Sequence, residues 1–253
     1  MYTMNKVIAI TQHKGGVGKT TTTVNLGAAL AMKGYKVLLI DLDAQANLTE
    51  SLGVNNQGDT IVNALTSSSK VEPIEVYRNL YVIPSSLDLA GVEVQLLNSY
   101  ARELILKGVI DQLRKTYNYI LIDCPPSLGL LTVNALSAAD EVIIPLQAQY
   151  LAVKGLNSLL DIINMIKKQL NKKLIIGGVL ITQYDSRKIL NREISETIRA
   201  DFKAEIFNTK IRDNVAIAEA PTAGQDIFKY APNSKGAQDY KALAEEIIKR
   251  SKK

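Results

Sequence analysis

Short apolar runs rich in β-branched residues alternate along the chain with segments of helical periodicity. Six runs have the length and composition of strands: residues 6–11, 36–41, 80–84, 119–123, 141–146 and 174–183. Because they are apolar at nearly every position, they fit strands buried on both faces, as in a parallel sheet. Helical spacing of apolar residues marks six further segments: residues 19–32, 101–115, 130–138, 151–170, 190–202 and 238–249. This alternation predicts an α/β fold, with a doubly wound, mostly parallel sheet flanked by helices and residues 1–253 forming a single domain.

Composition supports a globular protein and excludes several classes. The 253 residues are 47% hydrophobic and 22% charged, which is incompatible with a disordered chain or a disulfide scaffold. The single cysteine, Cys124, cannot form a disulfide within the chain or supply the ligands of an iron–sulfur cluster alone. No apolar run approaches the roughly 18 to 20 residues that cross a bilayer, and the apolar part of the N-terminus is too short for a signal peptide. We therefore expect a soluble, cytoplasmic protein.

The net charge of +5 is distributed unevenly along the sequence. Residues 1–149 contain 11 Lys and Arg against 13 Asp and Glu, whereas residues 150–253 contain 19 against 12. A basic surface can attract nucleic acid or anionic lipid through its long-range field. Charge alone leaves this interpretation open beside the simpler one, in which the lysines only solvate helix surfaces.

A glycine-rich loop joins the first predicted strand to the first predicted helix, with the sequence QHKGGVGKTT at residues 12–21. Successive N–H groups in such a loop, together with the helix N-terminus, form a concavity for phosphate oxygens. Lys19 is placed to neutralise phosphate charge and the Thr20 hydroxyl to ligate Mg²⁺, although His13 stands where the strict phosphate-loop pattern has its first glycine. The expected phosphate-binding residues are Gly15, Gly16, Val17, Gly18, Lys19, Thr20 and Thr21.

Carboxylates follow two more of the predicted strands. Asp41 and Asp43 lie at the end of the strand at residues 36–41, and Asp123 ends the strand at residues 119–123. Ligands of open α/β sheets bind at the carboxyl ends of the strands. An acid that ends an apolar strand is the Walker B arrangement, in which Asp123 would hold Mg²⁺ through a water molecule.

Lys14 is not needed for cradling phosphate, because Lys19 already serves that purpose. The sequence KGGVGKTT at residues 14–21 resembles the deviant Walker A loop of the ParA/MinD ATPases, a P-loop NTPase family. Asp41, Asp43 and Gln45 match its D-x-D-x-Q element, and the DCPP sequence at residues 123–126 matches its D-x-P-P element. Residues 182–187 and 211–221 resemble two C-terminal elements, so the similarity extends over nearly the whole chain and is strongest to the small ParA/Soj-type partition ATPases.

The resemblance implies roles for individual residues. The extra lysine of the family reaches the nucleotide of a partner subunit, so Lys14 would act across a homodimer that forms when ATP is bound. Asp43 would orient the attacking water and, with Lys14 and Lys19, complete the catalytic set. Magnesium would be held by Thr20, Asp41 and Asp123. The stretch at residues 211–221 lies against adenine in the family, which assigns Arg212 and Asn214 to nucleotide binding.

The resemblance also implies a cellular function. ATP-bound dimers of this type bind double-stranded DNA nonspecifically, and hydrolysis stimulated by a ParB-like centromere-binding protein releases the DNA and moves a chromosome or plasmid cargo. Such a protein is associated with the nucleoid. Asp213 and Ala216 occupy positions that are often basic in relatives, so we expect the DNA contacts to come instead from Arg187, Lys188 and Arg192.

Two alternatives remain open. A MinD-like positioning ATPase would act at a membrane or on a cargo other than DNA, but Glu245 and Glu246 in the last helix would oppose anionic lipid, so a membrane partner is not expected. A P-loop metabolic enzyme would carry a substrate lid, and no such segment is evident in the sequence.

Overall fold

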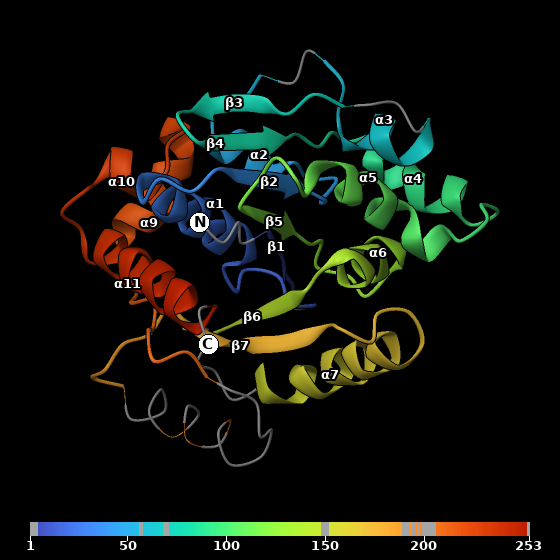
Figure 1. Cartoon of the computed structure of the whole chain (residues 1–253). Coiled ribbons are helices and arrows are strands. Elements are labelled where there is room, and N and C mark those ends of the chain that lie inside the picture. Colours follow the sequence, from blue (N-terminus) through green and yellow to red (C-terminus); the bar gives the residue numbers. More distant parts are fainter. Residues whose placement is uncertain are drawn as a thin grey trace.

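The computed structural model describes residues 5–55, 58–67, 71–147, 152–188, 193, 196, 198 and 206–251, with only the backbone of residues 152–155. Within them, seven strands form one sheet in the order β3-β4-β2-β5-β1-β6-β7 (Figure 1). The strands are β1 (Lys6–Ile10), β2 (Val37–Asp41), β3 (Ile74–Tyr77), β4 (Leu80–Ile83), β5 (Tyr119–Asp123), β6 (Glu141–Gln147) and β7 (Ile175–Thr182). All neighbouring pairs are parallel except β3 and β4, which confirms the predicted mostly parallel sheet.

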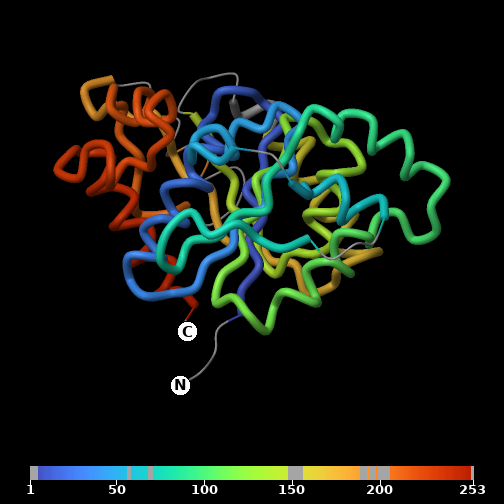
Figure 2. The backbone as a smooth tube through the Cα atoms, turned by 90° about the horizontal axis from the view of Figure 1, so that it is seen from above, coloured from blue at the N-terminus to red at the C-terminus, as the bar shows by residue number. Residues whose placement is uncertain are grey.

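Helices cover both faces of the sheet, as the doubly wound prediction requires (Figures 1 and 2). One face is packed by α1 (Lys19–Met32), α2 (Asn47–Ser51), α9 (Val215–Glu219), α10 (Ile227–Tyr230) and α11 (Lys235–Arg250). The other is packed by α3 (Ile61–Thr66), α4 (Leu89–Leu96), α5 (Ile105–Leu113), α6 (Leu130–Ala138) and α7 (Ala152–Gln169). Two short 3₁₀ helices, η1 (Arg102–Leu104) and η2 (Ala220–Ala223), complete the described elements.

Strand β1 shows why the central strands are apolar at nearly every position. Val7 and Ala9 belong to the core on one face, whereas Ile8 and Ile10 belong to the core on the other, and all four are fully buried. Successive side chains of a strand point to opposite faces, so a sheet covered on both sides needs apolar residues throughout.

The structure contains elements that the sequence pattern missed. Strand β3 is half exposed, because it lies at the sheet edge and turns into β4 through Asn79, which has a φ of +71°. Helices α2, α3, α4, α9 and α10 have only four to eight residues, too few for several turns of helical periodicity. The last helix begins earlier than predicted, at Lys235, because the Ser234 hydroxyl accepts a hydrogen bond from the Ala237 N–H and caps it. The helix predicted at residues 190–202 lies outside the described residues, apart from residues 193, 196 and 198.

The sheet order brings the chemistry to one edge. Strand β5 lies between β1 and β2, and in the register Asp123 is opposite both Ile10 and Asp41. The glycine-rich loop begins directly after β1, so it faces the carboxylates that follow β2 and β5. The first strand begins at the opposite edge near the end of α11, where the Lys6 ammonium donates to the Ser251 hydroxyl at 3.2 Å; the blue and red ends of the described chain lie close together there (Figure 2).

Candidate functional site

The glycine-rich loop has the backbone of an anion cradle. Gly16 and Gly18 have φ values of +73° and +88°, in the left-handed region that favours glycine. Gly18 stands at the N-cap of α1 and has no side chain to cap the first N–H groups of the helix. Those N–H groups and the positive end of the helix dipole are therefore available to an anion in the loop.

Lys19 is a buried cation in the first turn of α1. Only 7% of the surface of Lys19 is exposed, and its ammonium lies 3.5 Å from the Lys14 carbonyl oxygen. Burial lowers the pKa of Lys19, while the nearby carboxylates of Asp123 and Asp43 raise it in part. A cation held out of water in this way is stabilised by an anionic ligand, and a nucleotide phosphate is such a ligand.

Asp123 is the corresponding buried acid. Its Oδ2 atom has no hydrogen-bond partner within the described part of the chain, and its Oδ1 accepts a long bond of 3.4 Å from the Thr23 hydroxyl. Burial, followed by repulsion from Asp41, raises the pKa of Asp123 to about 8, although interactions with Thr20 and Lys19 oppose the rise. A divalent cation at Oδ2 would stabilise the ionised carboxylate and so offset the cost of burying its charge. Asp123 therefore fits the predicted magnesium site.

The described residues contain no group of three or more His, Cys, Asp or Glu side chains that could hold a metal ion by themselves. Magnesium commonly uses one or two protein side chains together with water and substrate phosphate oxygens. Thr20 and Asp123 lie beside the phosphate loop, and two side chains that leave positions for water and phosphate oxygens fit the expected magnesium site.

Asp41 and Asp43 differ in what their oxygens already bind. Asp41 is fully buried; its Oδ1 accepts from the Asp43 N–H at 3.2 Å, and its Oδ2 accepts from the Thr49 N–H at 3.0 Å and hydroxyl at 2.7 Å. Burial nevertheless raises the pKa of Asp41 to about 6. Asp43 is only half buried, and its Oδ1 accepts from the Gln45 N–H at 3.0 Å. Asp41 therefore holds the turn that presents Asp43, and Thr49, which the sequence analysis missed, is its partner.

A cavity of about 280 Å³ adjoins the phosphate loop at Gly18 and Thr21. Arg212 and Asn214, the two residues that the resemblance assigns to nucleotide binding, line it. The Arg212 guanidinium is held by the Asp239 carboxylate at 2.6 and 3.0 Å, and the Asn214 side chain caps α9 by accepting from the Ala216 N–H. Asp239, 27 residues away in the sequence, fixes this wall of the cavity, and no local pattern pointed to it.

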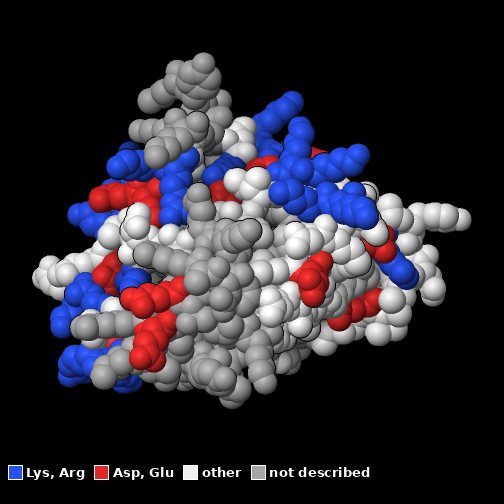
Figure 3. Space-filling model, turned by 90° about the horizontal axis from the view of Figure 1, so that it is seen from below, with Lys and Arg blue, Asp and Glu red and all other residues white. Residues whose placement is uncertain are grey.

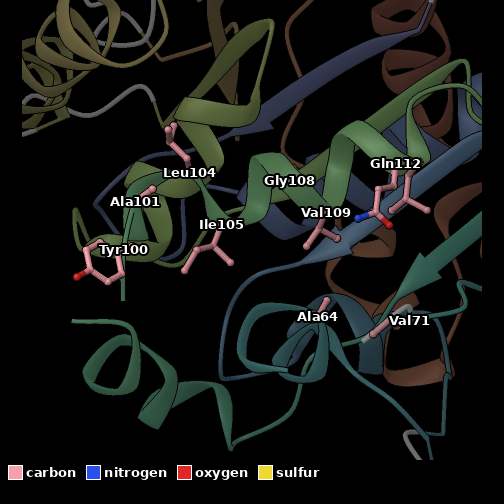
Figure 4. A pocket seen from close by; sticks show the side chains of 10 residues that line it. Ala64, Val71, Tyr100, Ala101, Leu104, Ile105, Gly108, Val109 and Gln112 are labelled. Carbon is pink, nitrogen blue, oxygen red and sulfur yellow. The ribbon is translucent and has the colours of Figure 1, made fainter. Parts of the chain in front are cut away.

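A different cavity, of about 300 Å³, lies between α3 and α5 together with the segment that leads into α5 (Figure 4). Its lining includes Ala64, Val71, Tyr100, Leu104 and Val109. None of the residues that line it is charged, and none belongs to the loop or the carboxylate cluster. It therefore offers no chemistry for phosphate transfer.

The predicted DNA-contacting residues are only partly described. The Arg187 guanidinium grips the Asp185 carboxylate at 2.9 and 3.0 Å, and its side chain is 88% exposed. Lys188 is also exposed, whereas Arg192 lies outside the described residues. Because Asp185 already neutralises Arg187, Lys188 is the stronger of the two described candidates for a phosphate contact.

Comparison with known proteins assigns the family. A family model described as an AAA domain matches residues 5–176. The sporulation initiation inhibitor protein Soj of Bacillus subtilis (strain 168) is 45% identical over 249 residues, covering 96% of this chain and 98% of that protein. The chain belongs to the Soj/ParA family of partition ATPases. The resemblance inferred from the loop and carboxylate motifs is thereby confirmed.

Solved structures similar to this Soj/ParA chain agree with the fold. A cobyrinic acid a,c-diamide synthase from Mycobacterium smegmatis, with bound ATP analog and magnesium, has a TM-score of 0.87 and 33% identity, covering 98% of this chain and 96% of that one. A putative plasmid partition protein from Borrelia burgdorferi B31, bound to AMPPNP, has a TM-score of 0.82 and 29% identity, covering 97% and 99%. The predicted P-loop ATPase fold of ParA/MinD type is confirmed.

The C-terminal helix of this Soj/ParA chain packs on the sheet core. Leu243, Ala244 and Ile247 of α11 are buried in the same core cluster as α1. Across the described ranges, no helix has both the length and the apolar content that a bilayer crossing requires.

Proposed function

We propose that this chain is a partition ATPase that binds ATP with Mg²⁺ and uses its hydrolysis to switch the binding of DNA on and off. The observation that carries the proposal is that a buried cation, Lys19, and a buried carboxylate with one oxygen lacking a hydrogen bond, Asp123, lie beside the same glycine-rich loop. Family membership supports it, because relatives named as chromosome-partitioning proteins align over nearly the whole chain.

Each residue has a distinct task in the proposed reaction. The loop N–H groups and the Lys19 ammonium bind the β- and γ-phosphates, and the cavity wall at Arg212 and Asn214 receives the base. Thr20, Asp41 and Asp123 would hold magnesium, which would supply positive charge beside the phosphates. Asp43 orients the attacking water, and Lys14 of a second copy stabilises the transferred phosphoryl group.

DNA binding would follow from pairing two copies. Figure 3 shows Lys and Arg side chains gathered in separate groups at the margins of one face of the molecule. In the described C-terminal part, Lys167, Lys168, Lys172 and Lys173 are among the exposed cations. When ATP favours the dimer, two weak sets of phosphate contacts act together, so the apparent affinity for DNA rises. A ParB-like partner would accelerate hydrolysis and end this state.

The proposed switch is tested by fluorescence anisotropy with a double-stranded DNA fragment in the absence of nucleotide, with ADP and with ATP. We expect tight binding only with ATP, equal affinity for fragments of different sequence, and a steep loss of affinity as salt is raised. Equal affinity in all three nucleotide states would reject the switch and favour a cargo other than DNA.

Replacing Asp43 by alanine separates hydrolysis from binding. We expect Asp43→Ala to lower the rate of ATP hydrolysis by about 100-fold or more, because a positioned group that orients a reactant contributes factors of this size. ATP binding and DNA binding should persist, which traps the ATP-bound dimer. The rate is measured by phosphate release, with Asp111→Ala in the exposed part of α5 as the matched carboxylate control. Hydrolysis at the parent rate in Asp43→Ala would show that another group orients the water.

A further inference from the structure

The end of strand β7 is bonded to the phosphate loop from outside. The Thr182 hydroxyl donates to the Val17 carbonyl oxygen at 2.8 Å, and the Gln183 amide donates to the Gly16 carbonyl oxygen at 3.0 Å. Thr182 is only 3% exposed, so its bond to Val17 is shielded from water. Two adjacent residues of one strand end thus satisfy two adjacent carbonyl groups of the loop, although about 165 residues separate them in the sequence.

Gln183 has an uncommon backbone conformation for this contact. Its φ is +50°, in the left-handed region that non-glycine residues seldom adopt. The Gln147 amide at the end of β6 donates to the Gln183 side-chain oxygen and so fixes the direction of the side chain. Strained backbone conformations persist where the surroundings hold them, and they concentrate at functional sites.

The same strand end also forms part of the base cavity. Thr182 and Gln183 line it beside Gly18, and the next residue, Tyr184, pairs with the opposite wall: its N–H donates to the Ile211 carbonyl at 2.9 Å. The residues that bond to the loop are therefore continuous with the residues that would receive the base.

These contacts have a physical consequence for phosphate binding. In an anion cradle the N–H groups must point inward, so the carbonyl oxygens, which would repel phosphate, must point elsewhere. A carbonyl oxygen that is buried without a donor is costly, whereas one that accepts a hydrogen bond is stable in that orientation. Donors on the outside of the loop therefore favour the loop shape that binds phosphate.

We propose that Thr182 and Gln183 are positioning residues for the nucleotide phosphates, which act by fixing the Val17 and Gly16 carbonyl groups. The inference rests on the proposed ATP binding and assigns a physical role to the first two residues of the T-x-x-D-x-R element. It also makes β7 the connection between the base cavity and the phosphate loop.

The test compares nucleotide affinity with the stability of the nucleotide-free protein in the full chain. Thr182→Val keeps the shape of the side chain and removes the donor, and we expect MgATP and MgADP to bind about 10-fold more weakly by calorimetry. Thr182→Ser restores the hydroxyl and should restore affinity. Gln183→Asn tolerates the left-handed backbone, but its amide is one methylene short, and we expect a loss of about 3-fold.

The matched control is Thr132→Val, because the buried Thr132 hydroxyl also donates to a carbonyl, that of Ser127 at 2.6 Å, but does not touch the phosphate loop. It should leave both nucleotide affinities unchanged. A purely structural role would instead lower the unfolding midpoint of Thr182→Val without nucleotide and leave its affinity at the parent value, which would overturn the inference. If Thr182→Val does not fold, unchanged affinity in the exposed Gln183→Asn overturns it equally. Failure of the unmodified protein to bind ATP would reject the proposed function itself.

Discussion

Replacing Lys19 by methionine is expected to weaken ATP binding by about 10²- to 10³-fold without destabilising the nucleotide-free protein. The affinity falls because the phosphates lose the buried cation of the loop, and removal of one partner of a buried ionic contact typically costs that much. The stability prediction follows from the lowered pKa of Lys19: the unfolded chain binds this proton more tightly than the folded one, so at neutral pH the buried ammonium opposes folding. Methionine keeps the apolar stem and removes the charge.

Calorimetric titration with MgATP and thermal unfolding without nucleotide measure the two effects. Lys33→Met, at the other end of α1, is the matched control: Lys33 is paired with Glu245 at 2.8 Å and is remote from the loop, so its loss should leave ATP affinity unchanged. If Lys19→Met unfolds at a clearly lower temperature than the parent, the buried ammonium stabilises the loop and our account of its burial is wrong.

Replacing Lys14 by alanine is expected to abolish dimerisation and to lower the hydrolysis rate by about 10³-fold, while a single copy still binds ATP with the parent affinity. The rate effect is of the size seen when a cationic finger supplied by a partner is removed. Binding by one copy should survive because the Lys14 atom that contacts Lys19 is its backbone carbonyl oxygen, which alanine retains. Analytical ultracentrifugation with a nonhydrolysable ATP analogue and phosphate release measure the outcome.

A mixing experiment shows whether Lys14 acts on its own nucleotide or on that of a second copy. In a mixed dimer of Lys14→Ala and Asp43→Ala chains, the site with intact Asp43 receives the Lys14 of the other chain. We expect the mixture to hydrolyse ATP much faster than either variant alone. A mixture as inactive as its components would place the action of Lys14 within one chain, and a parent protein that stays monomeric with the analogue would remove the dimer from the mechanism.

The motifs whose place in the fold the sequence predicted correctly consist of neighbouring residues. The phosphate loop is a run of adjacent residues between a strand and a helix, so its backbone geometry depends mainly on local glycines such as Gly16 and Gly18. Asp123 was predictable because an acid that ends an apolar strand must lie at the carboxyl edge of the sheet. Strand β3 escaped prediction because an edge strand lacks the apolar pattern of a buried one.

The contacts that the sequence did not predict join different elements of the fold. Thr49 in α2 bonds Asp41 at the end of β2, Asp239 in α11 holds Arg212, and Thr182 at the end of β7 bonds Val17 in the phosphate loop. Each partner is a common polar residue whose surroundings arise only when separate elements pack together. A sequence pattern shows neither the partner nor the loss of water that makes the contact strong.

The sequence by itself therefore determined the class of fold, the family and the edge of the sheet where nucleotide chemistry occurs, because these depend on local periodicity and on motifs of neighbouring residues. The tertiary structure decided how far the reactive groups are exposed to water and in which direction their pKa values shift. Burial in the folded chain removes water from Lys19 and Asp123, which lowers the pKa of Lys19 and raises that of Asp123. Folding also brings β7 against the phosphate loop, since burial and long-range hydrogen bonds exist only once the whole sheet has formed.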